Sequence, residues 1–355
     1  MSRKANITNF PIKIRLGEES DIDQIVKITR QYPQELGYVR IPSLKEALKR
    51  HTLLVADYEQ TPCVAFVNYY PRKDGWNTVY EIATHKGFVG RGIGRYLLDA
   101  VPCPTRLKCT TDNSANIFYK KSHFKLIRTE EGKKRKLNVW ERKFLFIFCK
   151  GGSRAAQEVC VDLGVTSGTR HNNRPYIQPF FVDIDWKKYD WLDYLLRIRA
   201  WKPVFALVPD YMDSSQKEDM LQAVNDLKDA GVLRVGVCPK FDGAIKDIPQ
   251  NCVVCVSYPT RYAGFLPDAT ELLGREIHLL GGSPKKIRAY LENNKNLKII
   301  SWDSNYHSNI SRFGGVYMAG NDSRTDTRKL GVDLSYVDTI KLNTQQIYKM
   351  LDSID

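Results

Sequence analysis

The sequence predicts an α/β protein of two domains, with a mixed α+β domain at residues 1–143 and a (β/α)8 barrel at residues 144–355. Two observations lead to this fold class. A chain of 355 residues is too long for one hydrophobic core of ordinary size. Strand candidates cluster in the first part of the chain, whereas short apolar strands alternate with helices in the second. Such alternation is typical of a parallel sheet with crossover helices.

The first domain is expected to have the element order β-α-α-β-β-β-α-β-α-β-β. Ser20 suits the N-cap of its first helix. The predicted strands are residues 12–16, 53–57, 63–70, 78–85, 106–110, 125–128 and 138–142. The predicted helices are residues 21–31, 43–50, 94–100 and 114–121.

The second domain begins with the apolar run "FLFIF" and then alternates. Its predicted strands are residues 144–149, 180–184, 204–208, 233–237, 253–257, 277–280, 298–302 and 339–342. Its predicted helices lie near residues 186–200, 215–230, 284–293 and 344–351. Eight strands with crossover helices fit a compact barrel, and a doubly wound open sheet is the alternative.

The positive charge is concentrated in the first domain. The chain has a formal net charge of +14, and residues 1–150 hold 28 Lys and Arg against 15 Asp and Glu. The run "EGKKRKLN" alone contains four adjacent basic residues. This excess favours a polyanionic partner, such as nucleic acid or a phosphate-rich cofactor. A merely solvated surface is the alternative.

Targeting and cysteine patterns predict a cytoplasmic protein without a metal. No apolar run reaches the length of a membrane span, and the N-terminus lacks the features of a secretory signal. The eight cysteines are scattered. Cys252 and Cys255 form a C-x2-C pair, but a zinc site needs a second pair that is missing. We therefore expect free thiols in a reducing compartment and no membrane partner.

A glycine loop in "THKGFVGRGIGRYLLDA" joins a predicted strand to a predicted helix. Glycines allow backbone N–H groups to approach a phosphate, and the N-terminus of the following helix adds a favourable dipole. The loop therefore predicts a phosphate site.

Residues 12–143 resemble the GNAT family of N-acetyltransferases, whose Q/R-x-x-G-x-G/A loop binds the pyrophosphate of acetyl-CoA. Gly92 and Gly94 match its glycines, and Val89 replaces the usual Gln or Arg. The segment "DNSANIFYKKSHFKLI" is similar to the family's N-x-x-A-x-x-F-Y-x-x-x-G-F pattern, with His123 at the glycine. The resemblance implies acetyl-CoA as cofactor. The implied cofactor-binding residues are Val89, Gly90, Arg91, Gly92, Ile93, Gly94, Arg95 and Asn113.

The same resemblance implies two catalytic residues. Tyr119 would protonate the departing CoA thiolate, and Glu81 would take a proton from an amine, directly or through water. Each has a structural alternative, an aromatic on the core face of a helix for Tyr119 and a surface strand residue for Glu81.

Acidic residues follow three predicted strands of the second domain. Asp183 and Asp185 end "FFVDIDW", Asp210 follows "VFALVP", and Asp303 ends "KIISW". In a parallel barrel the catalytic residues come from the C-terminal ends of several strands. Turn and cap roles are the structural alternative, because Asp favours both.

The segments "FVDIDW", "LVPDY", "GVCPK", "VSYPTRYAG", "HLLGGSP" and "IISWDSN" resemble the tRNA-guanine transglycosylase superfamily, over roughly residues 144–312. The closer match is its phage and bacterial branch, which inserts 7-deazaguanine bases into DNA. The resemblance implies Asp303 as nucleophile and Asp183 as general acid/base, with Asp185 as its rival. Asp210 would read the base. The rest of the implied base pocket is Tyr262, Gly264 and Gly282.

The implied reaction is a double displacement. A carboxylate attacks C1′ of the nucleoside and expels guanine, and an incoming 7-deazaguanine base then displaces the carboxylate with retention of configuration. The tRNA enzymes of the superfamily carry a C-terminal zinc cluster, but no cysteine follows Cys255 here. DNA is therefore the expected partner, and tRNA is disfavoured. A base in duplex DNA would have to be flipped out. The branch also allows a phage-encoded protein acting in the host cytoplasm.

The leading hypothesis is a DNA-modifying guanine/7-deazaguanine transglycosylase with a fused GNAT domain, which either acylates the modified base or binds DNA. One alternative is an N-acetyltransferase whose degenerate barrel serves as a nucleic-acid-binding module. Others are a base-excising glycosidase and a pure binding protein.

Overall fold

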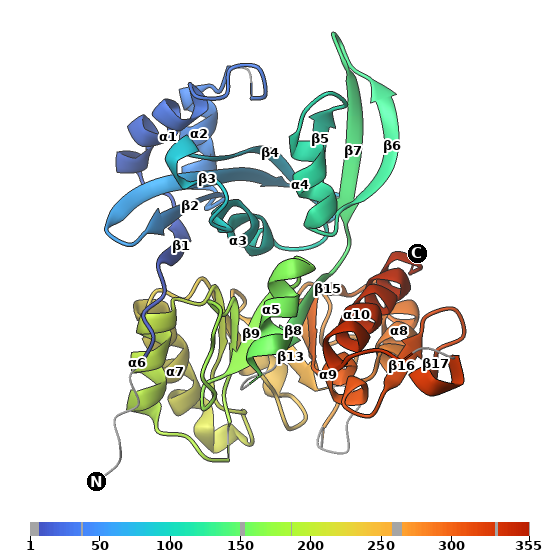
Figure 1. Cartoon of the computed structure of the whole chain (residues 1–355). Helices are drawn as coiled ribbons and strands as arrows, with labels where there is room; N and C mark the ends of the chain where they lie inside the picture. Colours follow the sequence, from blue (N-terminus) through green and yellow to red (C-terminus); the bar gives the residue numbers. More distant parts are fainter. Residues whose placement is uncertain are drawn as a thin grey trace. The chain divides into compact units, whose positions relative to one another are not determined.

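The computed structural model describes residues 7–36, 38–149, 153–185, 187–257, 265–330 and 333–354. The chain divides into two compact units (Figure 1). Unit 1 comprises Met1–Lys143 with Ala200–Val204, and unit 2 comprises Phe144–Arg199 with Phe205–Asp355.

The described residues of unit 1 form one seven-stranded sheet and four α-helices. Its strands are β1 (Ile12–Leu16), β2 (Leu53–Tyr58), β3 (Thr61–Pro71), β4 (Asn77–Thr84), β5 (Thr105–Thr110), β6 (Lys125–Glu131) and β7 (Lys136–Arg142). Its helices are α1 (Ile22–Thr29), α2 (Ile41–Lys49), α3 (Ile93–Ala100) and α4 (Ala115–Lys121). The strand order is β1-β2-β3-β4-β5-β7-β6.

The sheet of unit 1 opens between β4 and β5, which pair in parallel. These two strands pair only through residues 77–79 and 105–107. On its other edge β4 pairs with β3, but the register shifts between Asn68 and Tyr69, so that Tyr80 is an extra residue in β4. A bulge of this kind bends a strand and increases its twist. The C-terminal half of β4 therefore leaves the edge of β5.

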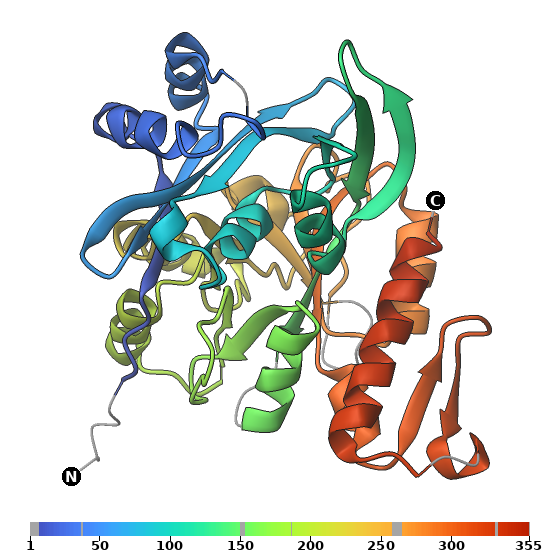
Figure 2. The same cartoon turned by 45° about the horizontal axis from the view of Figure 1, so that its top comes forward.

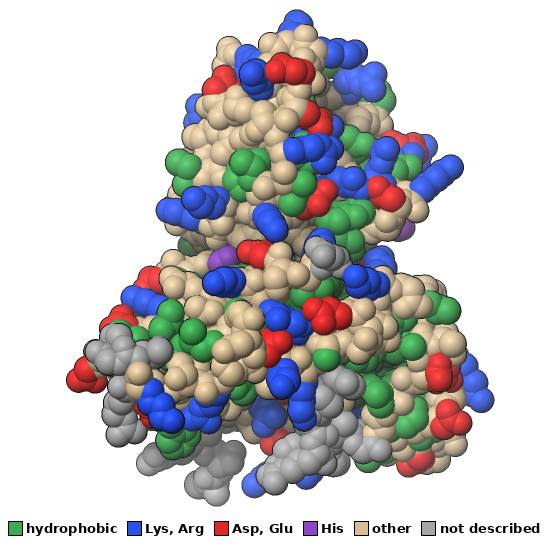
Figure 3. All heavy atoms as spheres, turned by 90° about the vertical axis from the view of Figure 1, so that its right-hand side faces the viewer, with side chains coloured by type: hydrophobic (Ala, Val, Ile, Leu, Met, Phe, Trp, Pro, Cys, Tyr) green, Lys and Arg blue, Asp and Glu red, His purple; other side chains and the backbone are tan. Residues whose placement is uncertain are grey.

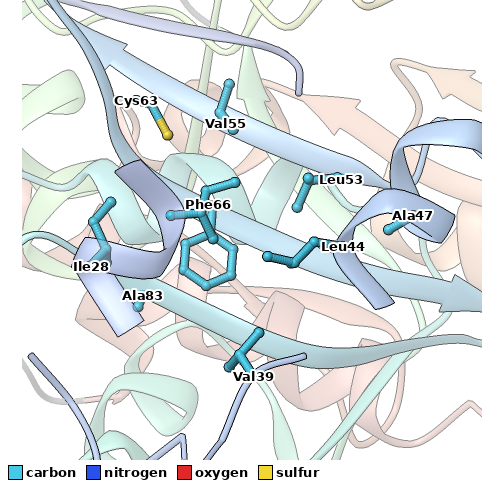
Figure 4. Packing of buried hydrophobic residues seen from close by; sticks show 10 residues of the cluster. Ile28, Val39, Leu44, Ala47, Leu53, Val55, Cys63, Phe66 and Ala83 are labelled. Carbon is cyan, nitrogen blue, oxygen red and sulfur yellow. The ribbon is translucent and has the colours of Figure 1, made fainter. Parts of the chain in front are cut away.

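The core of unit 1 is packed around Phe66 of β3, which is fully buried (Figure 4). Ile25 and Ile28, three residues apart on α1, pack into the same cluster, as do Leu44 and Ala47 of α2. Because residues three and four apart share one helix face, each helix turns a single apolar stripe towards the sheet. The centre of β3 is a continuous run of buried residues, which explains why this strand could be predicted from the sequence.

Unit 2 is built on a closed barrel of eight parallel strands in the order β10-β11-β12-β13-β14-β15-β8-β9. The strands are β8 (Leu145–Cys149), β9 (Thr166–Arg170), β10 (Phe181–Asp183), β11 (Phe205–Leu207), β12 (Arg234–Val237), β13 (Val253–Ser257), β14 (Glu276–Leu280) and β15 (Lys298–Ser304). This confirms the predicted parallel barrel and excludes the doubly wound open sheet.

The crossovers are less regular than a (β/α)8 barrel predicts. In the part of the chain that the structure describes, four crossovers carry α-helices: α5 (Arg154–Asp162), α6 (Trp191–Trp201), α7 (Lys217–Asp229) and α8 (Pro284–Asn293). Within the described residues, the β9–β10 connection has no helix and the β12–β13 connection has only a short 3-10 helix, η4 (Ala244–Asp247). Another 3-10 helix, η3 (Ser214–Gln216), precedes α7. The predicted regular ring of helices is therefore only partly present.

The predicted strand at residues 339–342 is wrong. These residues lie in α10 (Tyr336–Asp352), where Ile340, Thr344, Ile347 and Leu351 are buried at helical spacing. The eighth barrel strand is instead β9, "TSGTR", whose small polar residues lack an apolar signal. A Cβ at its Gly168 would lie only 2.9 Å from Ile147 Cγ2, so glycine permits the close packing of β9 inside the barrel.

The chain after β15 forms α9 (Tyr306–Ser311), the hairpin of β16 (Gly315–Met318) and β17 (Ser323–Asp326), the 3-10 helix η5 (Thr327–Leu330) and α10. The long helix α10 runs beside this hairpin (Figure 2). Asn343 joins the two, because its Nδ2 donates to the Gly315 carbonyl and its Oδ1 accepts from the Tyr317 N–H. No helix in the described part of the chain is long and apolar enough to cross a membrane.

Candidate functional site

In unit 1 the predicted phosphate loop connects β4 to α3 and is anchored at its start. The 3-10 helix η2 (Lys86–Phe88) follows β4. Gln31 Oε1 accepts from the Lys86 N–H at 2.8 Å, and His85 Nδ1 accepts from the Gly87 N–H at 3.2 Å. These bonds hold the backbone just before the glycines.

The glycines of the loop have a conformation and an environment that suit a ligand. Gly90 and Gly92 have φ angles of 84° and 79°, a region that side chains disfavour, and a Cβ at either position would meet no atom within 4 Å. Gly92 is also the N-cap of α3, whose first N–H groups have no partner within the helix. An anion could therefore approach the main chain here, which fits the pyrophosphate of acetyl-CoA.

The other predicted loop residues have separate roles. Gly94 packs α3 against its neighbours, because a Cβ there would lie 3.3 Å from Thr84 Oγ1. Ile93 is buried and Val89 is exposed. Arg91 stacks over the rings of Tyr58 and Phe88, at 5.0 and 5.3 Å from their centroids, and so stays at the loop.

Arg95 and Asn113, by contrast, are engaged within the protein. Arg95 Nη1 donates to the Lys121 carbonyl at 2.8 Å, and its Nε pairs with Asp99. Asn113 Oδ1 accepts from the Ala115 N–H at 2.8 Å, at the N-terminus of α4. Both side chains are thus fixed by the fold, and their predicted contact with a cofactor has no independent support in their geometry.

Glu81 has the properties of a general base. It lies on β4, next to the bulge and beyond the residues that pair with β5, and Asn68 Nδ2 on β3 donates to its Oε2 at 2.6 Å. Burial raises the pKa of Glu81, and the bond from Asn68 opposes this rise. A carboxylate with a raised pKa accepts a proton from an amine more readily than an ordinary one.

Tyr119 is buried in an aromatic cluster on α4. Its ring centroid lies 5.4 Å from that of Phe118 and 6.4 Å from that of Trp140. Burial raises the pKa of its phenol well above the usual value, so that the phenol keeps its proton. Within the described residues no hydrogen bond joins Tyr119 to Glu81. His123, which lies close after α4, has a φ angle of 57°, a conformation that glycine adopts more readily than a residue with a side chain.

In unit 2 three of the predicted acids occupy the same end of the barrel. Asp183 ends β10, Asp303 lies near the end of β15, and Asp210 follows β11. The pKa of Asp183 is raised to about 7, chiefly by burial and then by the charges of Asp303 and Asp210, while Arg170 opposes this rise. Because the other two carboxylates act on Asp183, the three form one electrostatic cluster.

Asp303 is held by the strand and the turn beside it. His278 Nε2 on β14 lies 3.2 Å from Asp303 Oδ1, and the Gly281 N–H donates to the same oxygen at 3.3 Å. The turn is tied to β15 by Trp302 Nε1, which donates to the Gly281 carbonyl, and by Ser304 Oγ, which donates to the Gly282 carbonyl. The predicted pocket residue Gly282 therefore supports the strand that carries Asp303.

Asp210 forms a buried ion pair. Its Oδ2 lies 3.3 Å from Lys240 Nζ, which also donates to Ser257 Oγ at 3.2 Å. Only 11% of each side chain of this pair is exposed. Burial raises the pKa of Asp210, and Lys240 opposes the rise. The pair places an acceptor and a cationic donor side by side at the barrel end.

Asp185 lies outside this cluster. Its Oδ2 accepts from Asn172, its Oδ1 from the Lys187 N–H, and its own N–H donates to His171. These are turn contacts, so the geometry favours Asp183 over Asp185 as the acid. The predicted pocket residues Tyr262 and Gly264 lie outside the described residues.

The sequence patterns did not predict three polar residues at this end of the barrel, namely Arg170, Lys240 and His278. Arg170 ends β9, a strand that the apolar pattern did not reveal. Lys240 ends "GVCPK", and His278 interrupts the apolar run "IHLL". The signal that could have identified the last two is a single charged or imidazole side chain within an apolar strand, as for His278, or shortly after one, as for Lys240. Such a group needs a partner when it is buried.

All eight cysteines lie within the described residues, where each is buried and free of disulfides. The same described ranges hold no group of three or more His, Cys, Asp or Glu side chains that could bind a metal ion.

A comparison with known protein families gives a match in each unit. Residues 49–126 match the model of the Acetyltransferase (GNAT) domain, so unit 1 contains an N-terminal GNAT domain. Residues 158–351 match the model described as "Family of unknown function (DUF6610)". This match spans more than half of the chain, and the protein belongs to that family. No curated protein matches the chain significantly.

Several solved structures share a limited likeness. Ard1 from Thermoplasma volcanium is 20% identical, with 37% of this chain and 97% of that one covered and a TM-score of 0.34. The ribosomal-protein-S18-alanine N-acetyltransferase from Escherichia coli is 14% identical, with 37% and 92% covered and a TM-score of 0.31. N-acetylglutamate synthase from Neisseria gonorrhoeae, complexed with coenzyme A and N-acetyl-glutamate, is 11% identical, with 37% and 35% covered and a TM-score of 0.31.

Proposed function

We propose that the protein transfers an acyl group from acetyl-CoA to an amine through its GNAT domain, and that its barrel carries a second site for base exchange in DNA. The observation that carries the first activity is the glycine loop between β4 and α3. Gly90 and Gly92 leave main-chain N–H groups open to an anion at the N-terminus of a helix.

In this proposal acetyl-CoA, when bound, supplies a thioester that an amine attacks. The loop N–H groups would hold the pyrophosphate, and Glu81 would take the proton of the amine. Tyr119 keeps its proton because burial raises its pKa, and in this proposal it would donate that proton to the departing thiolate.

Calorimetric titration of the full-length protein with acetyl-CoA tests the first activity. We expect saturable binding and, with a panel of amines, release of free CoA thiol. A flat titration would reject the assignment of acetyl-CoA as cofactor.

The second activity rests on the unequal environments of Asp183 and Asp303. The pKa of Asp183 is raised to about 7, so a fraction of this carboxyl is protonated at neutral pH. Asp303 instead lies within reach of an imidazole nitrogen and a backbone N–H. Two carboxyl groups whose environments differ in this way are suited to act as the acid and the nucleophile of a glycosyl transfer. Asp303 would attack C1′, while Asp183 would protonate the departing guanine.

The incoming base in this proposal is a 7-deazaguanine, and Asp210 with Lys240 would contact it. The sequence segments that resemble the DNA branch of the transglycosylases support this choice. The basic excess of the chain supports a DNA substrate, although on the face shown in Figure 3 the Lys and Arg side chains are interspersed with Asp and Glu.

Mass spectrometry of nucleosides tests the second activity. DNA from cells that express the protein with a supply of 7-deazaguanine should contain the modified nucleoside, and Asp303→Asn should abolish it. Abasic sites without the modified nucleoside would favour a base-excising glycosidase. Unmodified, intact DNA would leave the barrel as a binding module.

A further inference from the structure

His278 is the most deeply buried polar group near the proposed nucleophile. None of its surface is exposed, and its ring packs between the rings of Phe181 and Phe205 at 5.0 and 5.1 Å. A buried imidazole needs partners for both of its nitrogens. It has them on the adjacent strand β15, in Ser301 and Asp303.

The two partners determine how the imidazole can be protonated. Nδ1 lies 2.7 Å from Ser301 Oγ, and Nε2 lies 3.2 Å from Asp303 Oδ1. An ionised carboxylate only accepts, so Nε2 must carry a proton to bond it. The Ser301 hydroxyl can then donate to Nδ1. The pairing of His278 with Ser301 in the β14–β15 register holds this arrangement on the backbone.

We propose that His278 is a positioning residue, which holds the nucleophilic carboxylate of Asp303 through Nε2–H while Ser301 selects the tautomer. This inference rests on the proposed base exchange at the barrel. The Gly281 N–H is shared between Oδ1, at 3.3 Å, and the backbone carbonyl of Asp303, at 3.1 Å. In this proposal Oδ2 attacks C1′ while the donors hold Oδ1.

The thiol of Cys149 also lies at this end of the barrel, as the last residue of β8. Burial, together with the charges of Asp303 and Asp183, raises its pKa well above the usual value. The thiol therefore keeps its proton. It is not the nucleophile of the site, because a nucleophilic cysteine requires a thiolate.

Kinetic measurements on matched variants test the role of His278. The assay follows incorporation of isotope-labelled free guanine into a guanine-containing DNA duplex. His278→Phe keeps an aromatic ring but removes the donor, and kcat should fall about 100-fold with KM nearly unchanged, as for a reacting group displaced by about 1 Å. His278→Gln offers an amide N–H near the place of Nε2 and should restore kcat to within about tenfold of the parent. Equal loss in the Gln and Phe variants, at unchanged melting temperature, would overturn the proposal.

Nitrogen NMR of protein isotope-labelled at histidine provides a test that is independent of activity. His278 should carry its proton on Nε2, and Ser301→Ala should shift the Nδ1 resonance. A proton on Nδ1 alone would overturn the positioning role. If the parent protein incorporates no guanine, the proposed exchange fails, whereas the NMR result still decides whether His278 donates to Asp303.

Discussion

Arg170 and Asp183, the last residues of neighbouring barrel strands, form an ion pair of 3.2 Å, and the pKa of Asp183 is nevertheless raised to about 7. An arginine at this distance normally lowers the pKa of a carboxyl group. Here burial and the charges of Asp303 and Asp210 outweigh it. Arg170 is the more exposed partner, with 60% of its side chain exposed against 22% for Asp183, and solvent screens its charge.

The raised pKa of Asp183 predicts a pH-dependent stability. Between about pH 4, where an ordinary aspartate titrates, and pH 7, the folded protein binds more protons at this site than the unfolded chain. The contribution of Asp183 to the free energy of unfolding is therefore full at low pH and falls as pH rises through this window. Asp183→Asn cannot ionise, so denaturant unfolding should show a smaller decline. Asp185→Asn, in the adjacent turn, is the control and should keep the decline of the parent.

Two glycine variants separate ligand binding from backbone strain. Gly92 and Gly75 both have positive φ, at 79° and 83°, and a Cβ at either would meet no atom within 4 Å. Aspartate at either position should therefore cost similar strain, about 1 kcal/mol. With acetyl-CoA at about 100 times its Kd, the parent should gain about 2.7 kcal/mol in stability. Gly92→Asp should lose this gain, because its carboxylate would face the pyrophosphate.

Thermal unfolding with and without acetyl-CoA measures the effect of these two variants. Gly75→Asp, in the turn between β3 and β4, should keep the full ligand-induced shift. An equal shift in Gly92→Asp and the parent would show that the loop does not bind the cofactor.

The contact between Asn68 and Glu81 predicts a shift in the pH dependence of acyl transfer. The 2.6 Å bond stabilises the ionised carboxylate, so Asn68→Ala should raise the pKa of Glu81 further. A general base is active when ionised, and the rising limb of the kcat/KM profile should therefore move to higher pH. Glu81→Gln should lower kcat/KM by about 100-fold or more. If the pH profile of kcat/KM is the same in Asn68→Ala and the parent, its rising limb reports a group other than Glu81.

The exposed turn between β6 and β7 offers a test of DNA binding. Lys133, Lys134, Arg135 and Lys136 are all exposed there. If all four contact phosphates, replacing them with Gln should reduce the slope of log K against log salt by about 0.9 for each. Filter binding to duplex DNA over a salt series measures this slope. A slope equal to that of the parent would place the DNA contact elsewhere.

Patterns of neighbouring residues were sufficient to predict most helices and strands and the glycine loop between β4 and α3. The run of buried residues in β3, the helix face of α1 and the glycines after β4 each depend on residues close together in the chain. Two predictions of secondary structure failed, and each failure has a physical reason. β9 has no apolar run, because Gly168 and its small neighbours fit between larger strands. Residues 339–342 contain β-branched side chains that resemble a strand, although the wider spacing of Ile340, Thr344 and Ile347 is helical.

The sequence by itself determined that acidic residues follow the barrel strands, that a glycine loop follows β4, and that strands alternate with helices in the second unit. These features follow from residue type and short-range periodicity. Only the tertiary structure decided which groups act together. Asp183 and Asp303 are far apart in the chain and belong to one cluster because the barrel closes through β8 and β9. His278 contacts Asp303 because β14 and β15 are neighbours in that barrel. Burial and neighbouring charges set the pKa of each carboxyl group, and both exist only after the strands have assembled.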